Sequence, residues 1–144
     1  MSNHPITLLR RCLGDVSGGT ALEFAFAIPS LILMTAGVVQ LGIGFLAQAG
    51  LRHGVETGAR YATVYVKSAS HTAEYPTVAE VKSKVTDSTF GLDKNSLSVA
   101  DPVVGSANGQ TYVQVSATYP VRFNFVFVTT PSFNLAYTRR SYRQ

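Results

Sequence analysis

An isolated carboxylate, Glu23, is the side chain of this sequence best placed to do specific chemistry. It stands at the head of an apolar run, residues 24–51, that carries no charge. An acidic residue near the centre of a bilayer costs about 3 kcal/mol on insertion scales, and ionisable groups that persist in membrane segments are usually paired or functional. The positive end of a helix dipole would offset part of that cost. Taken alone, Glu23 could also simply lie at the level of the lipid headgroups.

The residues before Glu23 suggest how its charge could be paired. Gly18 and Gly19 precede it by about one helical turn. A cut after Gly18 would leave 126 residues (144 minus 18), with a new α-amine on Gly19 and Glu23 as the fifth residue. The ammonium and the carboxylate could then neutralise each other, within one chain or between neighbours. A cut after Gly19 would make Glu23 the fourth residue, so the register stays open.

Other chemistry finds little support in the pattern. The sequence has no Gly-rich phosphate loop, no nucleophile elbow and no paired catalytic carboxylates. His53 with Glu56, and His71 with Glu74, have a spacing that could hold a metal, but no third ligand is evident. The single cysteine, Cys12, permits neither an internal disulfide nor a zinc cluster. We therefore expect no enzyme activity, no cofactor and no metal.

The charge pattern argues against nucleic-acid binding and predicts the orientation of the chain in the membrane. The net charge is +4, but only 14% of residues are charged and the basic ones are scattered, with no polybasic arm. Arg10 and Arg11 precede the apolar run, so the N-terminus should be cytoplasmic and the C-terminal part periplasmic.

The apolar run has the properties of a membrane-spanning helix. Its 28 residues would form a helix of about 42 Å, whereas about 20 residues cross the hydrocarbon core. A backbone in lipid must satisfy its own hydrogen bonds, which favours a helix. Pro29 should kink this helix or loosen one turn. Small residues would let another helix approach closely, and they include Gly37, Gly42, Gly44 and Gly50.

An amphipathic stripe predicts that the helix continues beyond the membrane. Apolar residues recur three and four apart, at Leu51, Val55, Ala59 and Ala62. Glu56 and Arg60 have the favourable order for a helical ion pair. Gly54 and Gly58 weaken this prediction, because each glycine costs about 1 kcal/mol of helix stability relative to alanine. We expect one face of this extension to lie on the C-terminal domain.

The remaining residues predict a small α+β domain. Thr77 and Glu80 resemble a capping box for a helix over 78–88, which Gly91 would end. Its apolar face would comprise Val78, Val81, Val85 and Phe90. Strands are predicted over 97–99 (prolonged by 103–104), 111–119, 121–128 and 133–142, with a turn over 105–109. The aromatic residues of this half would either pack in a core or form an adhesive surface: Tyr112, Tyr119, Phe123, Phe125, Phe127 and Phe133.

The domain organisation is built from these segments. Residues 1–18 are predicted to be a basic leader, 19–67 a transmembrane and extended N-terminal helix, and 68–144 a periplasmic domain. The expected fold class is α+β and pilin-like, with a short helix and a three- or four-stranded antiparallel sheet.

The stretch from Gly18 to Phe24 resembles the start of TadE-like minor pseudopilins, which belong to the tight-adherence (Flp-type) pilus systems of bacteria. Members carry a glycine, four variable residues and then Glu-Phe. In this sequence the glycine is Gly18, the variable residues are 19–22, and Glu23-Phe24 follows. The stretch from Arg52 to Val64 resembles the segment after the membrane helix in that family. The resemblance covers residues 14–64 well and the rest in outline.

This resemblance implies several partners and residue roles. A prepilin peptidase would cut after Gly18, Gly19 would become the N-terminus, and Glu23 with Phe24 would serve recognition and assembly. The partners would be other pilins or pseudopilins, the assembly platform and membrane lipid. The protein would reside in the bacterial inner membrane or, after processing, in the pilus, and would support pilus assembly or adhesion.

Two alternatives stay open. Ala47-Gln48-Ala49 fits the small-x-small rule of signal peptidase, which would release a periplasmic binding domain beginning at Gly50. However, the apolar run exceeds the 7–15 residues of an ordinary signal. Alternatively, an uncleaved anchor would carry an external enzymatic or ligand-binding domain, although residues 68–144 supply no catalytic set.

Overall fold

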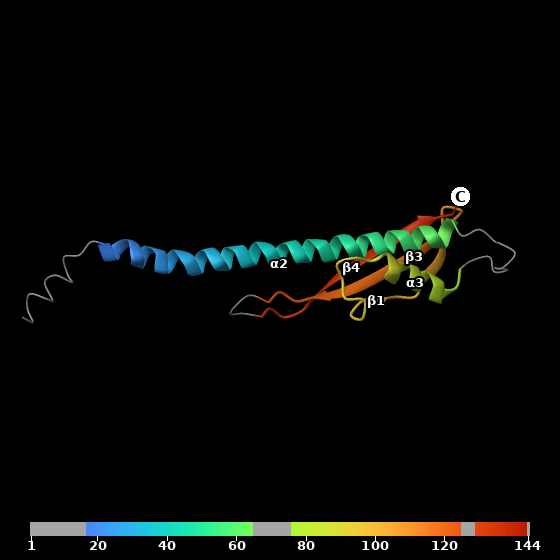
Figure 1. The fold of residues 1–144 in the computed structure, drawn as a ribbon. Helices are drawn as coiled ribbons and strands as arrows, with labels where there is room; N and C mark the ends of the chain where they lie inside the picture. Colours follow the sequence, from blue (N-terminus) through green and yellow to red (C-terminus); the bar gives the residue numbers. More distant parts are fainter. Residues whose placement is uncertain (1–16, 65–75, 125–128, 144) are drawn as a thin grey trace, which may run out of the picture. The chain divides into compact units, whose positions relative to one another are not determined.

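A computed structural model describes residues 17–64, 76–124 and 129–143. Along the chain, helix α2 precedes a shorter helix, α3, and strands β1 to β4 (Figure 1). The chain divides into two units, residues 1–38 and 39–144, and each is described by itself. The predicted α+β class is confirmed: a long apolar helix, a short helix and a four-stranded antiparallel sheet.

Helix α2 spans Ser17–Val64 and contains both the apolar run and the stripe from Leu51 to Ala62 that the sequence analysis placed in a helix. The boundary predicted between residues 67 and 68 lies outside the described residues, as do residues 1–16 of the predicted leader. The helix is continuous through Pro29, so the loosening expected there does not divide it. In the part of the chain that the structure describes, α2 is the one helix long and apolar enough to cross a membrane.

Helix α3 (Val78–Ser88) begins as the sequence predicts. The Thr77 hydroxyl accepts from the backbone N–H of Glu80 (3.3 Å), and the Glu80 carboxylate accepts from that of Thr77 (2.8 Å). Its C-terminal end differs from the prediction. Thr89, not Gly91, is the C-cap, and its N–H donates to the carbonyl of Val85 at 3.1 Å. Gly91 comes two residues later, with a positive φ of 67°.

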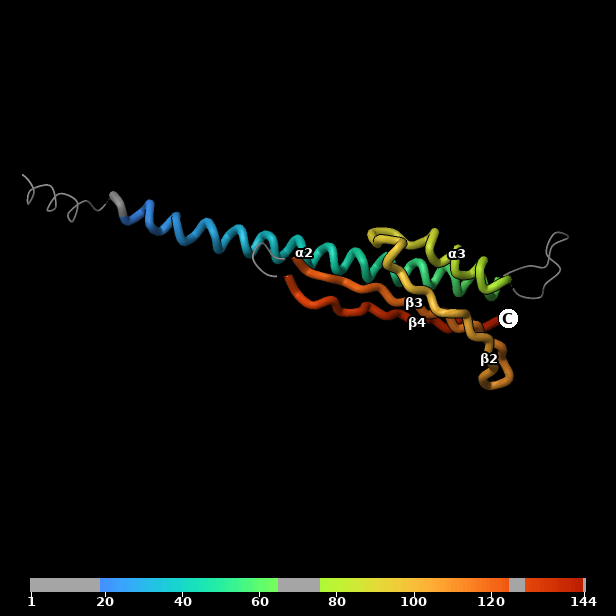
Figure 2. The backbone as a smooth tube through the Cα atoms, turned by 90° about the horizontal axis from the view of Figure 1, so that it is seen from below, coloured from blue at the N-terminus to red at the C-terminus, as the bar shows by residue number. Residues whose placement is uncertain are grey.

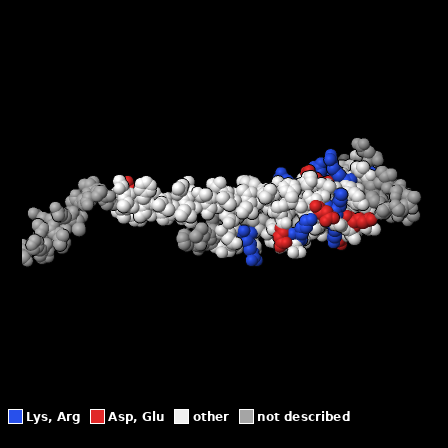
Figure 3. Space-filling view, viewed as in Figure 1, with Lys and Arg blue, Asp and Glu red and all other residues white. Residues whose placement is uncertain are grey.

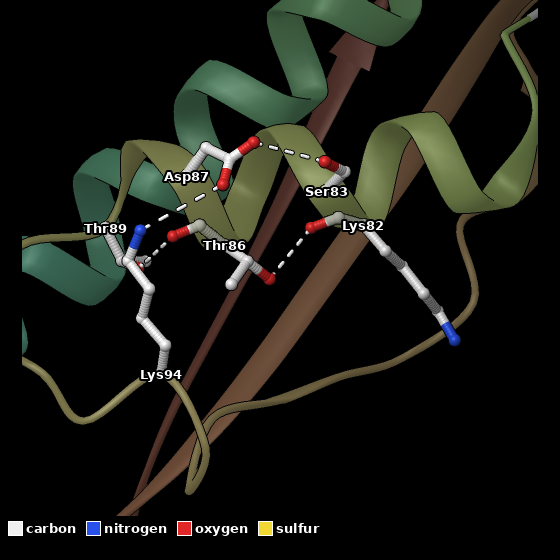
Figure 4. A network of polar contacts seen from close by, with 6 residues as sticks. All are labelled: Lys82, Ser83, Thr86, Asp87, Thr89 and Lys94. Atoms are coloured by element: carbon white, nitrogen blue, oxygen red, sulfur yellow. Dashed lines mark hydrogen bonds and ion pairs between the residues drawn. The ribbon is translucent and has the colours of Figure 1, made fainter.

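Polar contacts hold the last turns of α3, and the Lys94 ammonium, in the loop after the helix, lies 4.0 Å from the Asp87 carboxylate (Figure 4). The Ser83 hydroxyl donates to Asp87 (3.1 Å), and the Thr86 hydroxyl to the carbonyl of Lys82 (3.0 Å). The Thr89 hydroxyl donates to the Thr86 carbonyl at 2.7 Å. Because Thr89 is buried, this bond satisfies a polar group that water does not reach.

Strand β3 (Gln110–Val121) is the centre of the sheet. Strand β4 (Phe133–Tyr142) pairs with it along one edge, from Val121↔Phe133 to Tyr112↔Tyr142. Strands β1 (Ser98–Val99) and β2 (Val103–Ala107) lie one after the other along the other edge. Between them, three residues oppose two of β3, since Val99 pairs with Ala117 and Val103 with Gln114. Pro102 lies at this irregularity, on an edge strand where its missing N–H breaks no ladder.

Two predicted boundaries in the sheet are wrong. The turn expected over 105–109 is confined to Asn108 and Gly109, because β2 continues to Ala107. Both turn residues have positive φ, 53° and 75°, as a two-residue hairpin turn of type I′ requires. The strand expected to start at Val121 is instead the end of β3, and residues 125–128 lie outside the described residues.

The hydrophobic core joins the second half of α2, helix α3 and one face of the sheet. Figures 1 and 2 show β3 and β4 beside this half of α2. The predicted stripe of α2 is fully buried there, as are alternate residues of β3. The core consists of Leu51, Val55, Ala59, Ala62, Val81, Val85, Val113, Val115 and Ala117. Of the apolar face predicted for α3, Val81 and Val85 are buried here, whereas Val78 and Phe90 are each 47% exposed.

Candidate processing and assembly site

The carboxylate of Glu23 lies in the second turn of α2 and is exposed. Glu23 is the one charged residue from Ser17 to Leu51. Within the described residues its side chain forms no hydrogen bond or ion pair. Phe24 beside it is also exposed, at 66%. Both side chains are therefore free to meet a peptidase, lipid or a neighbouring subunit.

The double glycine is helical in this structure, since α2 begins at Ser17. A Cβ added at Gly19 would meet no atom within 4 Å. Packing thus does not require glycine at this position. Two glycines cost about 1 kcal/mol each in a helix, so this turn opens more easily than one made of alanines.

The expected helix-packing positions differ from one another. Gly37 and Gly42 face open space, with nothing within 4 Å of an added Cβ. Gly44 instead lies under the ring of Phe123, and a Cβ added at Gly44 would be 3.1 Å from the Cζ atom of that ring. Pro29 lies inside α2 with exposed residues around it. Gly37, Gly42 and Pro29 thus remain open to a partner, whereas Gly44 receives a residue of its own chain.

A second glycine face lies further along α2, and of its members only Gly50 was predicted from the sequence to admit a close neighbour. Gly50, Gly54 and Gly58 stand four residues apart, and α3 with its C-cap packs directly on them. A Cβ at Gly50 would collide with the carbonyl oxygen of Phe90, and one at Gly54 with the Thr89 methyl. At Gly58 it would meet a methyl group of Val85. The regular four-residue spacing is the signal in the sequence that indicates a close helix crossing.

Glu56 has a different partner from the one expected. Among the described residues it forms no ion pair with Arg60; its carboxylate accepts a hydrogen bond from the Tyr137 hydroxyl at 2.9 Å. The Arg52 guanidinium lies 5.5 Å from the centre of the same ring. The hydrogen bond to Glu56 and, next, burial raise the pKa of Tyr137 above its usual 10.0. This contact ties α2 to β4.

The metal pairs considered from the sequence do not form a site within the described residues. His53 lies against the ring of Phe90, at 5.7 Å between centroids, and Glu56 is engaged by Tyr137. His71 and Glu74 lie outside the described residues. No group of three metal-ligating side chains gathers in the described ranges.

Charged side chains are distributed unevenly along the chain. Figure 3 shows blue and red atoms over the α3 and sheet region, whereas the first part of α2 is almost entirely white. This distribution fits a helix anchored in lipid, with a domain that stands in water.

Comparison with known proteins supports the resemblance seen in the sequence. Residues 18–60 match the family model described as TadE-like protein. No curated protein and no solved structure matches the chain. The matched segment begins at the glycine of the expected cleavage site and ends two residues after Gly58. It includes Glu23, the apolar run and the glycine face that receives α3. Over residues 18–60 the chain is therefore similar to TadE-like proteins, a match that indicates a protein associated with tight-adherence pili.

Proposed function

We propose that this protein is a minor pseudopilin that a prepilin peptidase processes between Gly18 and Gly19. In this role it supports the assembly or adhesion of a tight-adherence pilus. The observation that carries the proposal is the TadE-like match over residues 18–60, a segment with an exposed carboxylate, Glu23, at the head of a membrane-length helix. We infer a structural role and no catalysis by the chain itself.

The processing step is a peptide hydrolysis. Water adds to the carbonyl carbon of Gly18, the C–N bond to Gly19 breaks, and the products are a Gly18 carboxylate and a Gly19 ammonium. The cleaved bond must leave the helix to enter a protease cleft. The low helix propensity of two adjacent glycines and the absence of packing at Gly19 favour this local unwinding.

The assembly step uses the charges that processing creates. The Gly19 ammonium of one subunit would pair with the Glu23 carboxylate of a neighbour and so set the stagger between their helices. Two opposite unit charges 4 Å apart attract by about 1 kcal/mol in water and about 4 kcal/mol at an effective dielectric of 20. A site bordered by lipid lies toward the stronger end, so one pair can select one register.

The proposed location depends on the same helix. Arg10 and Arg11 hold the leader on the cytoplasmic side of the inner membrane, where the peptidase acts. The domain after α2 is then periplasmic, or exposed on the filament after assembly.

The signal-peptidase alternative meets a specific difficulty. The Ala49–Gly50 bond lies inside α2, and Gly50 is buried against the backbone of Phe90. A chain cut there would begin with a charged amine at a buried position, which is costly unless it is paired. This argues against a domain released at Gly50.

N-terminal sequencing and intact mass of the protein from native membranes test the processing. A chain starting at Gly19 supports the proposal, and one starting at Thr20 moves the register by one residue. A chain starting at Gly50 or retaining Met1 contradicts it. Glu23→Gln then tests assembly: the variant should stay in the membrane but fail to enter the pilus complex. Glu23→Asp, which keeps the charge, should recover part of that assembly.

A further inference from the structure

We propose that the end of the β3–β4 hairpin is a second membrane contact, with the rings of Phe123 and Phe133 seated in lipid at the periplasmic interface. The inference concerns described residues 121–124 and 129–133 and the part of α2 that they touch. It rests on the membrane anchoring by α2 that the proposed function also requires, but not on processing or pilus assembly.

Two contacts fix the hairpin end to α2 at one level. The Gln40 side chain donates a hydrogen bond to the backbone carbonyl of Asn124 at 2.9 Å. One turn further along, Gly44 lies under the ring of Phe123. Because Gly44 has no side chain, the aromatic ring approaches the helix backbone closely. The hairpin end therefore lies beside residues 40–44.

This level coincides with the expected exit of α2 from the hydrocarbon. The apolar run begins at Phe24, and about 20 residues cross the core, which brings the helix to the boundary near Ile43. Burial in the domain begins at Ala47, one turn later. Exposed apolar residues continue through this level, at Leu41, Ile43 and Phe45. A lipid surface that covers them would also reach the hairpin end.

The side chains of the hairpin end suit an interface between lipid and water. The rings of Phe123 and Phe133 lie 5.3 Å apart, and Phe133 is 41% exposed although it is large and apolar. Arg122, next to the pair, is exposed and could reach headgroup phosphates while its stem stays among the lipid chains. No acidic residue occurs after Asp101. Anionic headgroups would therefore meet no repulsion from this part of the sequence.

The described backbone on both sides of this end is paired, which suits a nonpolar environment where unpaired amides are costly. The Phe123 N–H donates to the Thr130 hydroxyl (3.1 Å), and the Thr130 N–H donates to the Phe123 carbonyl (3.0 Å). Asn124 and Thr129 form a further bridge.

The absence of native tryptophan makes a direct test feasible. In full-length chain reconstituted into phosphatidylcholine and phosphatidylglycerol vesicles, F133W would be the single tryptophan. Lipids with brominated acyl chains quench a tryptophan that touches them. Tyr142→Trp is the matched control, because Tyr142 is similarly exposed (46%) at the opposite end of β4. Phe26→Trp, on the exposed face of the membrane helix, reports whether α2 spans.

We expect quenching of F133W to be several-fold stronger than that of Y142W and to approach that of F26W. Asn124→Trp, whose side chain is exposed, repeats the measurement in case F133W does not fold. The proposal is overturned if F133W and N124W are quenched no more than Y142W while F26W is quenched strongly. A blue-shifted F133W emission without bromine quenching would mean that protein covers the ring, which also overturns it. Loss of F26W quenching would instead refute the membrane anchoring itself.

Discussion

Replacing Gly50 with alanine should destabilise the domain although it improves the helix. A Cβ at Gly50 would collide with the carbonyl oxygen of Phe90 and lie 2.9 Å from its carbonyl carbon and 3.2 Å from its nitrogen. These are backbone atoms, which no change of rotamer can move. Helix α2 and the segment after α3 must therefore separate, and the contacts around them loosen.

The size of the effect can be worked from two opposing contributions. Alanine gains about 1 kcal/mol over glycine in helix propensity, whereas overpacking a core typically costs about 1–3 kcal/mol. The backbone collision at Gly50 puts its cost at the upper end, so we expect a net loss of about 2 kcal/mol. Gly54→Ala should cost less. The nearest atom to its added Cβ is the side-chain methyl of Thr89, and the nearest backbone atom, the Val85 carbonyl oxygen, is 2.8 Å away. Gly58→Ala should cost least of the three, because the added Cβ would collide with a side-chain methyl of Val85 and its nearest backbone atom is 3.7 Å away.

The assay is urea unfolding of the full-length chain in detergent micelles, monitored by circular dichroism, for all three variants. Gly42→Ala is the control, since it makes the same substitution in the same helix with no atom within 4 Å. The free energy of unfolding should fall most for G50A, then G54A, then G58A, and should not fall for G42A. Equal stability of G50A and the parent protein would refute the close crossing.

Three other substitutions test separate features of the domain. Thr77→Ala removes the N-cap of α3 and should cost about 1 kcal/mol of unfolding free energy in the same urea assay; no loss would contradict the capping box. Asn108→Ala forces alanine into the left-handed region at φ 53° and should cost about 1 kcal/mol by thermal unfolding, whereas Asn108→Gly should restore stability. The hydrogen bond to Glu56 raises the pKa of Tyr137 above 10.0, so its contribution is fully present below pH 10 and is lost as pH rises through the raised value. Tyr137→Phe should therefore flatten the fall of the urea midpoint above pH 10, and an unchanged slope would count against this hydrogen bond.

The features that the sequence predicts well are those with local causes. Thr77 and Glu80 are three residues apart, so the capping box can be read without knowledge of the fold, and α3 begins where it indicates. The cleanly alternating stretch over 111–119 lies within β3, and the strand over 133–142 has the predicted bounds. The stripe from Leu51 to Ala62 predicts the buried face of α2 because a helix repeats every 3.6 residues.

Features that depend on distant partners could not be predicted in the same way. By helix propensity alone Gly54 and Gly58 weaken the helix, and only the position of α3 shows that they permit close approach. Glu56 bonds to Tyr137, 81 residues away, in place of Arg60 one turn away. The end of β3 at Val121 is set by pairing with Phe133 across the hairpin. In each case tertiary contacts overrode a plausible local pattern.

The TadE-like segment contains two sites in α2, Glu23 and Gly50, whose substitutions should have independent effects. Glu23 is exposed at the head of the helix and its side chain bonds to no described residue, whereas Gly50, 27 residues later, is buried under the residue after the C-cap of α3. Distant sites that share no partners have additive effects, within about 0.5 kcal/mol. Glu23→Gln should thus abolish assembly while leaving the unfolding free energy unchanged. G50A should lower that free energy and yet leave N-terminal processing at Gly18 intact. If E23Q also unfolded the domain, or G50A blocked processing, the helix would be acting as one coupled element, and the separation of assembly from folding would be wrong.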